Sequence, residues 1–328
     1  MSLKDEIKNY RLKIDKLVLK LSDLVLYQLD RDVNALNEAF IMAYNDEVFN
    51  LHQYESSLQN ALKLELFCAL TPLSGSLSFL AIQILAANRI MQSHHFTQAD
   101  KYYRKKCGII INHLRAPITV IDSIKSEQGY KLTGKLTWAS GYGIFDNVVV
   151  GFHHEGRELQ AVMPFKPQEG CLIGDVDDTF VGVGMNTVSI DLNHYEVRSK
   201  DVISCVEIGN YTKQKAVSKT IHFALYGIGL GAIRAISDED VKSEAQKRLE
   251  KLKEAFMSAN DGQRMDELRI ELFECVLKTI TTGMVLYGGK SMLSTQRLQQ
   301  YYRELIMFNS NGLNGTVKEL FKASYLAG

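Results

Sequence analysis

The segment at residues 129–152 reads GYKLTGKLTWASGYGIFDNVVVGF, and it decides the fold. Two runs rich in β-branched and aromatic residues, which favour strands, are separated here by a glycine-containing turn. Trp138, the only tryptophan in the chain, ends the first run and is followed closely by Ser140 and Gly141. A large ring beside a hydroxyl group and a glycine fits a strand whose end faces a flat ligand. We therefore expect a sheet in the middle of the chain, with Trp138 at a binding surface.

Strand-like patterning extends outward from this segment over residues 108–204. Apolar residues recur at every second position in LQAVMPF (residues 159–165) and TVSIDL (residues 187–192). On both sides of this region the apolar spacing becomes helical, as in Val241, Ala245 and Leu249. The sequence therefore predicts a mainly α, α+β chain with a helical domain at residues 1–106, a β-domain at residues 107–205 and a helical bundle at residues 206–328.

Local signals predict where several helices begin and end. The acidic residues at 238–240 suit the positive end of a helix dipole, and residues 260–262 (Asn-Asp-Gly) predict a turn. Thr316, with Glu319 three residues later, matches a capping box and predicts the start of the last helix. The most apolar run, residues 77–87, is well short of the roughly 20 residues that a membrane span requires. It predicts a buried helix, and we expect no membrane association.

Composition excludes several classes of protein. With 328 residues, of which 46% are hydrophobic, the chain can bury a large core. Lysine plus arginine and aspartate plus glutamate both number 38, so no basic field exists to attract nucleic acid. The five cysteines form no CxxC pair, which argues against a disulfide framework and a zinc ribbon. The N-terminus is charged from its fourth residue, so we expect a cytoplasmic protein with reduced thiols.

Three segments, in the same order along the chain, resemble the acyl-CoA dehydrogenase superfamily. Residues 134–141 (GKLTWASG) are similar to the family's strand that places a tryptophan and a hydroxyl against flavin. Residues 184–192 (GMNTVSIDL) are similar to the strand that closes the family's β-domain. Tyr287-Gly288-Gly289, followed by Arg297 and by Tyr302-Arg303-Glu304, resembles a segment near the family's C-terminus. The resemblance implies a middle domain of barrel or sandwich form and a C-terminal four-helix bundle.

The resemblance also implies a flavin-dependent oxidoreductase that acts on an acyl-CoA or a similar small substrate. Trp138 would shield one face of the flavin ring, and Ser140 would donate a hydrogen bond to it. Asn112, Gly288 and Gly289 stand where the family has other cofactor contacts. FAD is the cofactor that the family implies, with FMN or no flavin left open. Family members form dimers or tetramers through the C-terminal bundle, so a homodimer or homotetramer is expected. An electron-transfer protein or a flavin reductase is the further partner that such chemistry implies.

The chain departs from the family at the catalytic base. Dehydrogenation needs a carboxylate to remove a proton alpha to the thioester, yet residues 305–317 and 208–237 contain no Asp or Glu. His222, on an otherwise apolar run, is the remaining candidate for a base, although a lone histidine on such a run is more often a core residue. The family's Gly-Ser turn is replaced by Arg115-Ala116-Pro117, and its adenine-binding Phe-Gly turn is absent.

Three hypotheses follow from this pattern. The first is a flavin-dependent oxidoreductase resembling acyl-CoA dehydrogenases. The second is a monooxygenase of the same fold, in which reduced flavin activates oxygen and no alpha-proton base is required. The third is a non-catalytic scaffold that keeps the fold for binding a partner.

Two remaining motifs have simpler explanations. Residues 227–231 (GIGLG) follow no strand and lack a lysine at the spacing of a phosphate-binding loop, so they predict close helix packing. The adjacent pairs His94-His95 and His153-His154 have diverging side chains and are interpreted as surface residues. We therefore predict no metal site.

Overall fold

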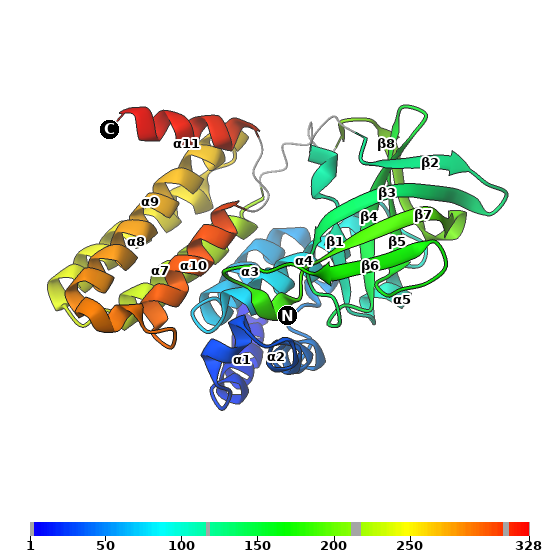
Figure 1. Cartoon of the computed structure of the whole chain (residues 1–328). Coiled ribbons are helices and arrows are strands. Elements are labelled where there is room, and N and C mark those ends of the chain that lie inside the picture. Colours follow the sequence, from blue (N-terminus) through cyan, green and yellow to red (C-terminus); the bar gives the residue numbers. More distant parts are fainter. Residues whose placement is uncertain (1–2, 116–118, 211–217, 311–314, 328) are drawn as a thin grey trace.

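The computed structural model describes residues 3–115, 119–210, 218–310 and 315–327. Helices come first, two small sheets follow, and a helical bundle ends the chain (Figure 1). The N-terminal elements are α1 (Leu3–Leu21), η1 (Leu26–Asp30), α2 (Val33–Asn45), η2 (Leu51–Gln53), α3 (Ser56–Leu70), α4 (Gly75–Ser93) and α5 (Ala99–Tyr103). This order agrees with the predicted one, while the exact division at residues 106 and 205 stays a prediction.

The strands form two four-stranded sheets that pack as a sandwich. The elements are β1 (Cys107–Ile110), η3 (Asn112–Arg115), β2 (Ile121–Lys125), β3 (Gly129–Ala139), β4 (Asn147–His154), β5 (Arg157–Pro164), β6 (Cys171–Val176), η4 (Val183–Met185), β7 (Val188–Arg198), η5 (Ser199–Asp201) and β8 (Val202–Glu207). One sheet has the order β1-β4-β5-β8, with β1 parallel to β4. The other has the order β2-β3-β7-β6 and is antiparallel. Residues 129–152 therefore supply one strand to each sheet, β3 to one and β4 to the other.

Strand β5 shows the limit of the period-two pattern. Its alternation identifies a strand, but both of its faces are buried, because Leu159, Ala161 and Met163 pack in the main hydrophobic cluster and Val162 packs in a second one. Val162, for example, packs with Ala87 and Met91 of α4. The spacing therefore located the strand without revealing its second buried face.

The C-terminal helices form a bundle beside the sheets. They are α7 (Thr220–Ala235), α8 (Glu239–Ser258), α9 (Gly262–Tyr287), η6 (Gly288–Met292), α10 (Arg297–Ser310) and α11 (Gly315–Ala327). Asp238 caps α8 by accepting a hydrogen bond from the amide of Val241, and Asp261 caps α9 in the same way through Arg264. The predicted helix start at residues 238–240 is confirmed. Of the predicted turn at residues 260–262, Asn260 and Asp261 lie between the two helices and Gly262 is the first residue of α9. The capping box is wrong in detail, because α11 begins at Gly315 and Thr316 is already within the helix.

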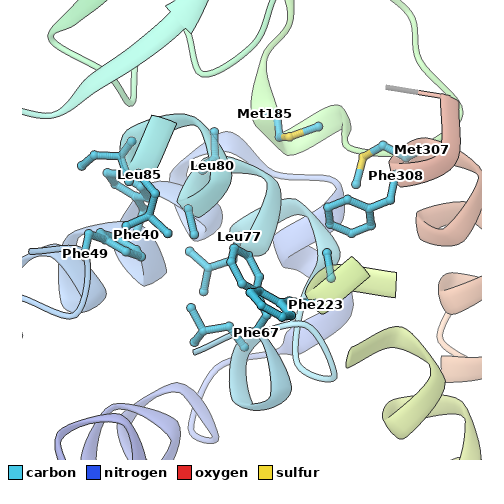
Figure 2. Close-up of a cluster of buried hydrophobic side chains, with 14 of the residues drawn as sticks. Phe40, Phe49, Phe67, Leu77, Leu80, Leu85, Met185, Phe223, Met307 and Phe308 are labelled. Carbon is cyan, nitrogen blue, oxygen red and sulfur yellow. The ribbon is translucent and has the colours of Figure 1, made fainter. Parts of the chain in front are cut away.

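Helix α4 is the central element of the core. Ser74 caps it, and the predicted buried run at residues 77–87 lies within it. Figure 2 shows Leu77, Leu80 and Leu85 of α4 among aromatic side chains of the neighbouring helices, with Met185 of η4 and Met307 of α10 at one end of the cluster. No helix in the described ranges is both long and apolar enough to cross a membrane. Helix α4 therefore joins the N-terminal helices, the sheets and the bundle in one core.

The glycines of α7 allow close helix packing, as predicted. A Cβ atom on Gly227 would lie 2.5 Å from the backbone oxygen of Phe67 in α3. One on Gly231 would lie 2.6 Å from the ring of Tyr301 in α10. The GIGLG motif is thus a packing surface on both sides of α7.

Candidate functional site

A β-bulge turns the side chain of Trp138 out of the sheet. Between the pairs Leu136–Ile190 and Ala139–Val188, strand β3 has two residues where β7 has one. Trp138 takes up the extra residue with φ = +61°, a conformation that bulky side chains rarely adopt. Leu136 and Ala139 remain buried, whereas Trp138 is 68% exposed. The bulge therefore exposes the tryptophan ring at a position where the alternation set by Leu132 and Leu136 would otherwise turn it inward.

Ser140 and Gly141, which follow Trp138, form hydrogen bonds with Thr187 and Met185. The hydroxyl of buried Ser140 lies 2.8 Å from that of Thr187, and the amide of Gly141 donates to the carbonyl of Met185 at 2.6 Å. Because the two hydroxyls share one hydrogen bond, the pair keeps one further O–H that can donate to a ligand. We call residues 138–141 the Trp138 ledge. It combines an exposed aromatic face with a fixed hydroxyl donor.

The other predicted cofactor residues lie on different elements. Asn112 is exposed on η3, which follows β1. Gly288 ends α9 with φ = +69°, and both it and Gly289 have open space where a Cβ atom would stand. The junction of α9 and α10 lies at the end of the bundle away from the sheets (Figure 1). The structure therefore pairs Ser140 with Trp138 within one ledge and sets the two glycines apart from it.

His222 lies in the interior of the bundle. Its Nε2–H donates to the backbone carbonyl of Met265 at 2.9 Å, and its ring packs 5.7 Å from that of Phe256. Burial lowers its pKa to about 4, although the hydrogen bond to Met265 opposes this shift. These contacts favour the packing interpretation of His222 over a role as a catalytic base.

Glu304 is a buried acid that precedes the segment without acidic residues. Its Oε1 accepts hydrogen bonds from the amide of Gly75 and from the side chain of Gln300, both at 2.9 Å. It therefore caps the N-terminus of α4 from across the core, and its Oε2 has no hydrogen-bond partner among the described residues. The sequence identified Glu304 only as part of a motif, because Gly75 lies 229 residues away and Gln300 lies on the preceding turn of α10. The capping contact accounts for Glu304 without a catalytic role.

Asp30 is a second buried acid that sequence reasoning missed. It is 1% exposed and forms a 2.8 Å ion pair with Arg303 of α10. Nothing in its local sequence marks it, since it ends a short 3₁₀ turn in a charged stretch. The signal that could have found it is the pairing with Arg303, which requires the fold.

Two cavities lie at the edge of the sandwich, apart from the ledge. The larger, of about 530 Å³, is lined among others by Ser123, Lys125, His153 and His154. Ser123 donates to the backbone carbonyl of His153 at 2.7 Å and contacts Nδ1 of His154 at 3.0 Å. His153 is buried, so the prediction that this pair lies on the surface is wrong for it. Within the described ranges, no cluster of three or more His, Cys, Asp or Glu residues could hold a metal ion.

Two parts of the sequence argument lie outside the described residues. They are Ala116-Pro117, which replaces the family's Gly-Ser turn, and Asn314, which stands in the turn before the last helix. The acidic residues at 238–240 begin α8 as predicted.

Solved structures resemble the chain over nearly its whole length. The structure of glutaryl-coenzyme A dehydrogenase with glutaryl-CoA has a TM-score of 0.79 at 12% identity, over 100% of this chain and 96% of that one. KijD3, in complex with FMN and an amino-keto dTDP-sugar, has a TM-score of 0.75 at 13% identity, over 97% and 94% of the two chains. XiaF from Streptomyces sp., in complex with FADH2 and glycerol, has a TM-score of 0.70 at 12% identity, over 100% and 98%.

These similarities define the class of fold. The chain has the acyl-CoA dehydrogenase fold, with its helical, β and bundle parts in the predicted order. No protein-family model matches the sequence, and no curated protein matches it. The chain is therefore a divergent example of this fold, and its activity has to be argued from its own residues.

Proposed function

We propose that this chain is a flavin-dependent oxidoreductase that binds the flavin ring against the Trp138 ledge. The observation that carries the proposal is the exposed Trp138 ring on a positive-φ bulge, with the Ser140–Thr187 hydroxyl pair beside it. Backbone conformations of this kind cost about 1–3 kcal/mol and persist at sites where they serve a purpose. A flavin ring is flat and largely apolar, and it needs such a wall together with a few hydrogen-bond donors. Bound flavin would supply the hydride or electron transfer.

The finer predictions belong to the same proposal. An acyl-CoA or a similar small molecule is the proposed substrate class, and the glutaryl-CoA complex of a structural neighbour supports it. FAD is the proposed flavin, and FMN is the alternative that the KijD3 complex supports. We further propose a cytoplasmic homodimer or homotetramer that exchanges electrons with a redox partner. Gly288 and Gly289, exposed at the far end of the bundle, would then meet flavin only from a neighbouring copy.

Titration with FAD and with FMN tests this proposal directly. Because Trp138 is the only tryptophan, its fluorescence reports on the ledge alone, and a flavin ring against it is expected to quench the emission. We expect Trp138→Ala to weaken flavin binding about tenfold, since the stacked aromatic surface is lost. Calorimetry measures the affinity of this variant, which has no tryptophan to observe.

The matched control is Leu172→Ala. Leu172 is also 68% exposed and lies on β6 of the same sheet, but outside the ledge. We expect this variant to keep the wild-type affinity, and Trp138→Phe to keep most of it. A wild-type protein that binds neither flavin would overturn the proposal and leave the scaffold hypothesis.

A reduced-flavin monooxygenase is a second candidate, favoured by the missing base. Residues 305–317 contain no acid, and the nearest one, Glu304, is buried as a helix cap. Oxygen transfer from reduced flavin does not require removal of an alpha proton. The absence of an acidic residue at 305–317 is therefore compatible with a monooxygenase. The resemblance to KijD3 and XiaF, solved with FMN and FADH2, supports this branch.

Anaerobic titration separates the two candidates. A monooxygenase that receives flavin from a reductase is expected to bind chemically reduced FMN or FAD on the order of tenfold more tightly than the oxidised form. Equal affinity for both forms would count against this candidate. Trp138→Ala serves as the control, because it should weaken the binding of both forms.

A further inference from the structure

Asp30 joins three segments that are far apart in the sequence. Its Oδ1 accepts hydrogen bonds from the amide of Gly182 at 2.6 Å and from the hydroxyl of Ser76 at 3.2 Å. Its Oδ2 accepts from Nη1 of Arg303 at 2.8 Å. We call Asp30, Ser76, Gly182 and Arg303 the Asp30 junction. An N-terminal turn, α4, the loop before η4 and α10 all meet there.

Arg303 also forms a direct hydrogen bond with the loop before η4, in addition to its contact through Asp30. Its Nη1 also donates to the backbone carbonyl of Phe180 at 2.9 Å, and its Nε donates to Gln299 at 3.0 Å. The ion pair therefore fixes the loop at two backbone positions, Phe180 and Gly182. Hydrogen bonds that involve an ionised group are stronger than neutral ones, so this attachment is firm.

Hydrogen bonds run from this loop to the ledge. The amide of Met185 donates to the carbonyl of Gly182 at 2.9 Å, and the carbonyl of Met185 accepts from the amide of Gly141 at 2.6 Å. Two residues beyond Met185, Thr187 holds the hydroxyl of Ser140. Gly182 is therefore connected to residues of the ledge through a single intervening residue, Met185.

The loop has little space in which to move. A Cβ atom on Gly184 would lie 2.9 Å from the backbone oxygen of Leu29, next to Asp30. One on Gly182 would lie 2.4 Å from Met185 and 3.3 Å from the sulfur of Met307. Figure 2 shows Met185 facing Met307 of α10 at the end of the buried cluster. Because a close-packed interior transmits displacement, a shift at Asp30 will reach the ledge.

We infer that Asp30 and Arg303 are positioning residues for the Trp138 ledge, which they hold in its binding geometry through the Phe180–Gly182 loop and Met185. The inference rests on the proposed function for its meaning, since the ledge is where flavin is proposed to bind. Neither residue is expected to touch flavin itself. Their effect passes through backbone hydrogen bonds to Gly141 and through the hydroxyl pair.

Trp138 fluorescence and flavin affinity test this inference in three variants. Asp30→Asn removes the charge of the pair, Arg303→Gln removes it from the α10 side, and Arg303→Lys keeps the charge. We expect the first two to shift the emission maximum of Trp138 and its quenching by acrylamide in the flavin-free protein. We also expect them to weaken FMN and FAD binding on the order of tenfold, and Arg303→Lys to recover most of the loss.

Asp46→Asn is the matched control. It breaks the exposed Lys20–Asp46 ion pair of 2.6 Å between α1 and the end of α2, away from the loop. We expect it to leave Trp138 emission and flavin affinity unchanged. If Asp30→Asn does not fold, Arg303→Gln supplies the same comparison from the less buried end of the pair, where the side chain is 14% exposed.

The outcomes separate this inference from the proposed function. Wild-type emission, quenching and affinity in folded Asp30→Asn or Arg303→Gln would overturn the inference and leave a purely structural ion pair. A wild-type protein that binds no flavin would overturn the proposed function, while the fluorescence comparison still decides whether the junction positions Trp138. Altered Trp138 emission in Asp30→Asn and Arg303→Gln, most of which is absent in Arg303→Lys, supports the inference in either case.

Discussion

Replacing Glu304 with glutamine is expected to remove a pH dependence of about 3 kcal/mol from the free energy of unfolding. Complete burial raises the pKa of Glu304 from its ordinary 4.5 to about 7. Arg297 opposes this shift, Asp30 adds to it, and the hydrogen bonds from Gly75 and Gln300 oppose it. A rise of this size corresponds to about 3 kcal/mol, at about 1.4 kcal/mol for each pH unit.

The sign follows from the proton that folding takes up. Below pH 4.5 Glu304 is protonated in both the folded and the unfolded chain, so its full contribution to stability is present. Between pH 4.5 and about 7 only the folded protein holds the proton, and the stability contributed by Glu304 falls as the pH rises. Glutamine cannot ionise, and its amide oxygen can still accept from Gly75. The Glu304→Gln variant should therefore gain stability relative to wild type as the pH increases.

Urea unfolding at several pH values between 5 and 8 measures this difference. All other titratable groups are common to the two proteins, so the quantity of interest is the difference in the free energy of unfolding between the variant and the wild type. Glu319→Gln is the control, because it makes the same chemical change at a side chain that is 77% exposed on α11. A Glu304→Gln difference that is constant from pH 5 to pH 8 would show that the buried carboxyl stays ionised.

Gly227→Ala is expected to lower the free energy of unfolding by about 1–3 kcal/mol. In an ordinary helix interior the same change would stabilise the protein by about 1 kcal/mol, because alanine favours the helix more than glycine does. Here the new methyl group would lie 2.5 Å from the backbone oxygen of Phe67 and 2.7 Å from Cβ of Thr71. Backbone cannot rotate away as a side chain can, so α3 and α7 would have to separate.

Chemical denaturation of both helix variants checks this reversal of sign. Gly315→Ala is the control, since Gly315 begins α11 and has nothing within 4 Å of the position of a Cβ atom. We expect that variant to be as stable as the wild type or slightly more stable. Equal or greater stability in Gly227→Ala would mean that the α3–α7 contact is looser than the structure indicates.

The order of elements could be predicted from sequence because it depends on local spacing and local caps. The period of apolar residues distinguishes helix from strand, and the acidic residues at 238–240 mark the start of α8, which Asp238 caps through a contact three residues away. The prediction at Thr316 failed by a shift of a residue or two, which is where local signals are weakest. Trp138 was also found locally, as the only tryptophan at the end of a strand-like run.

The parts that could not be predicted depend on pairing between distant residues. The bulge that exposes Trp138 exists only relative to β7, about 50 residues later, and the sequence of β3 alone does not reveal it. The Asp30–Arg303 pair joins residues that are 273 positions apart. Glu304 was identified only as part of a motif. Its role as the cap of α4, through the amide of Gly75, depends on the packing of α10 against α4 and could not be predicted from the local sequence. Buried polar groups are identified by their partners, and here the fold supplies those partners.

The bulge in β3 makes the ledge depend on the length of the chain more than on the residues within it. Exchanging Thr137 for another side chain leaves the extra residue in place, and the ring stays outside the sheet. Deleting Thr137 would remove the bulge and restore the period of two, with Trp138 in the single outward position between the inward-facing Leu136 and Ala139. Such a deletion is expected to keep the ring exposed while it removes the need for a positive φ at Trp138 and changes the position of the ring relative to the Ser140–Thr187 hydroxyl pair.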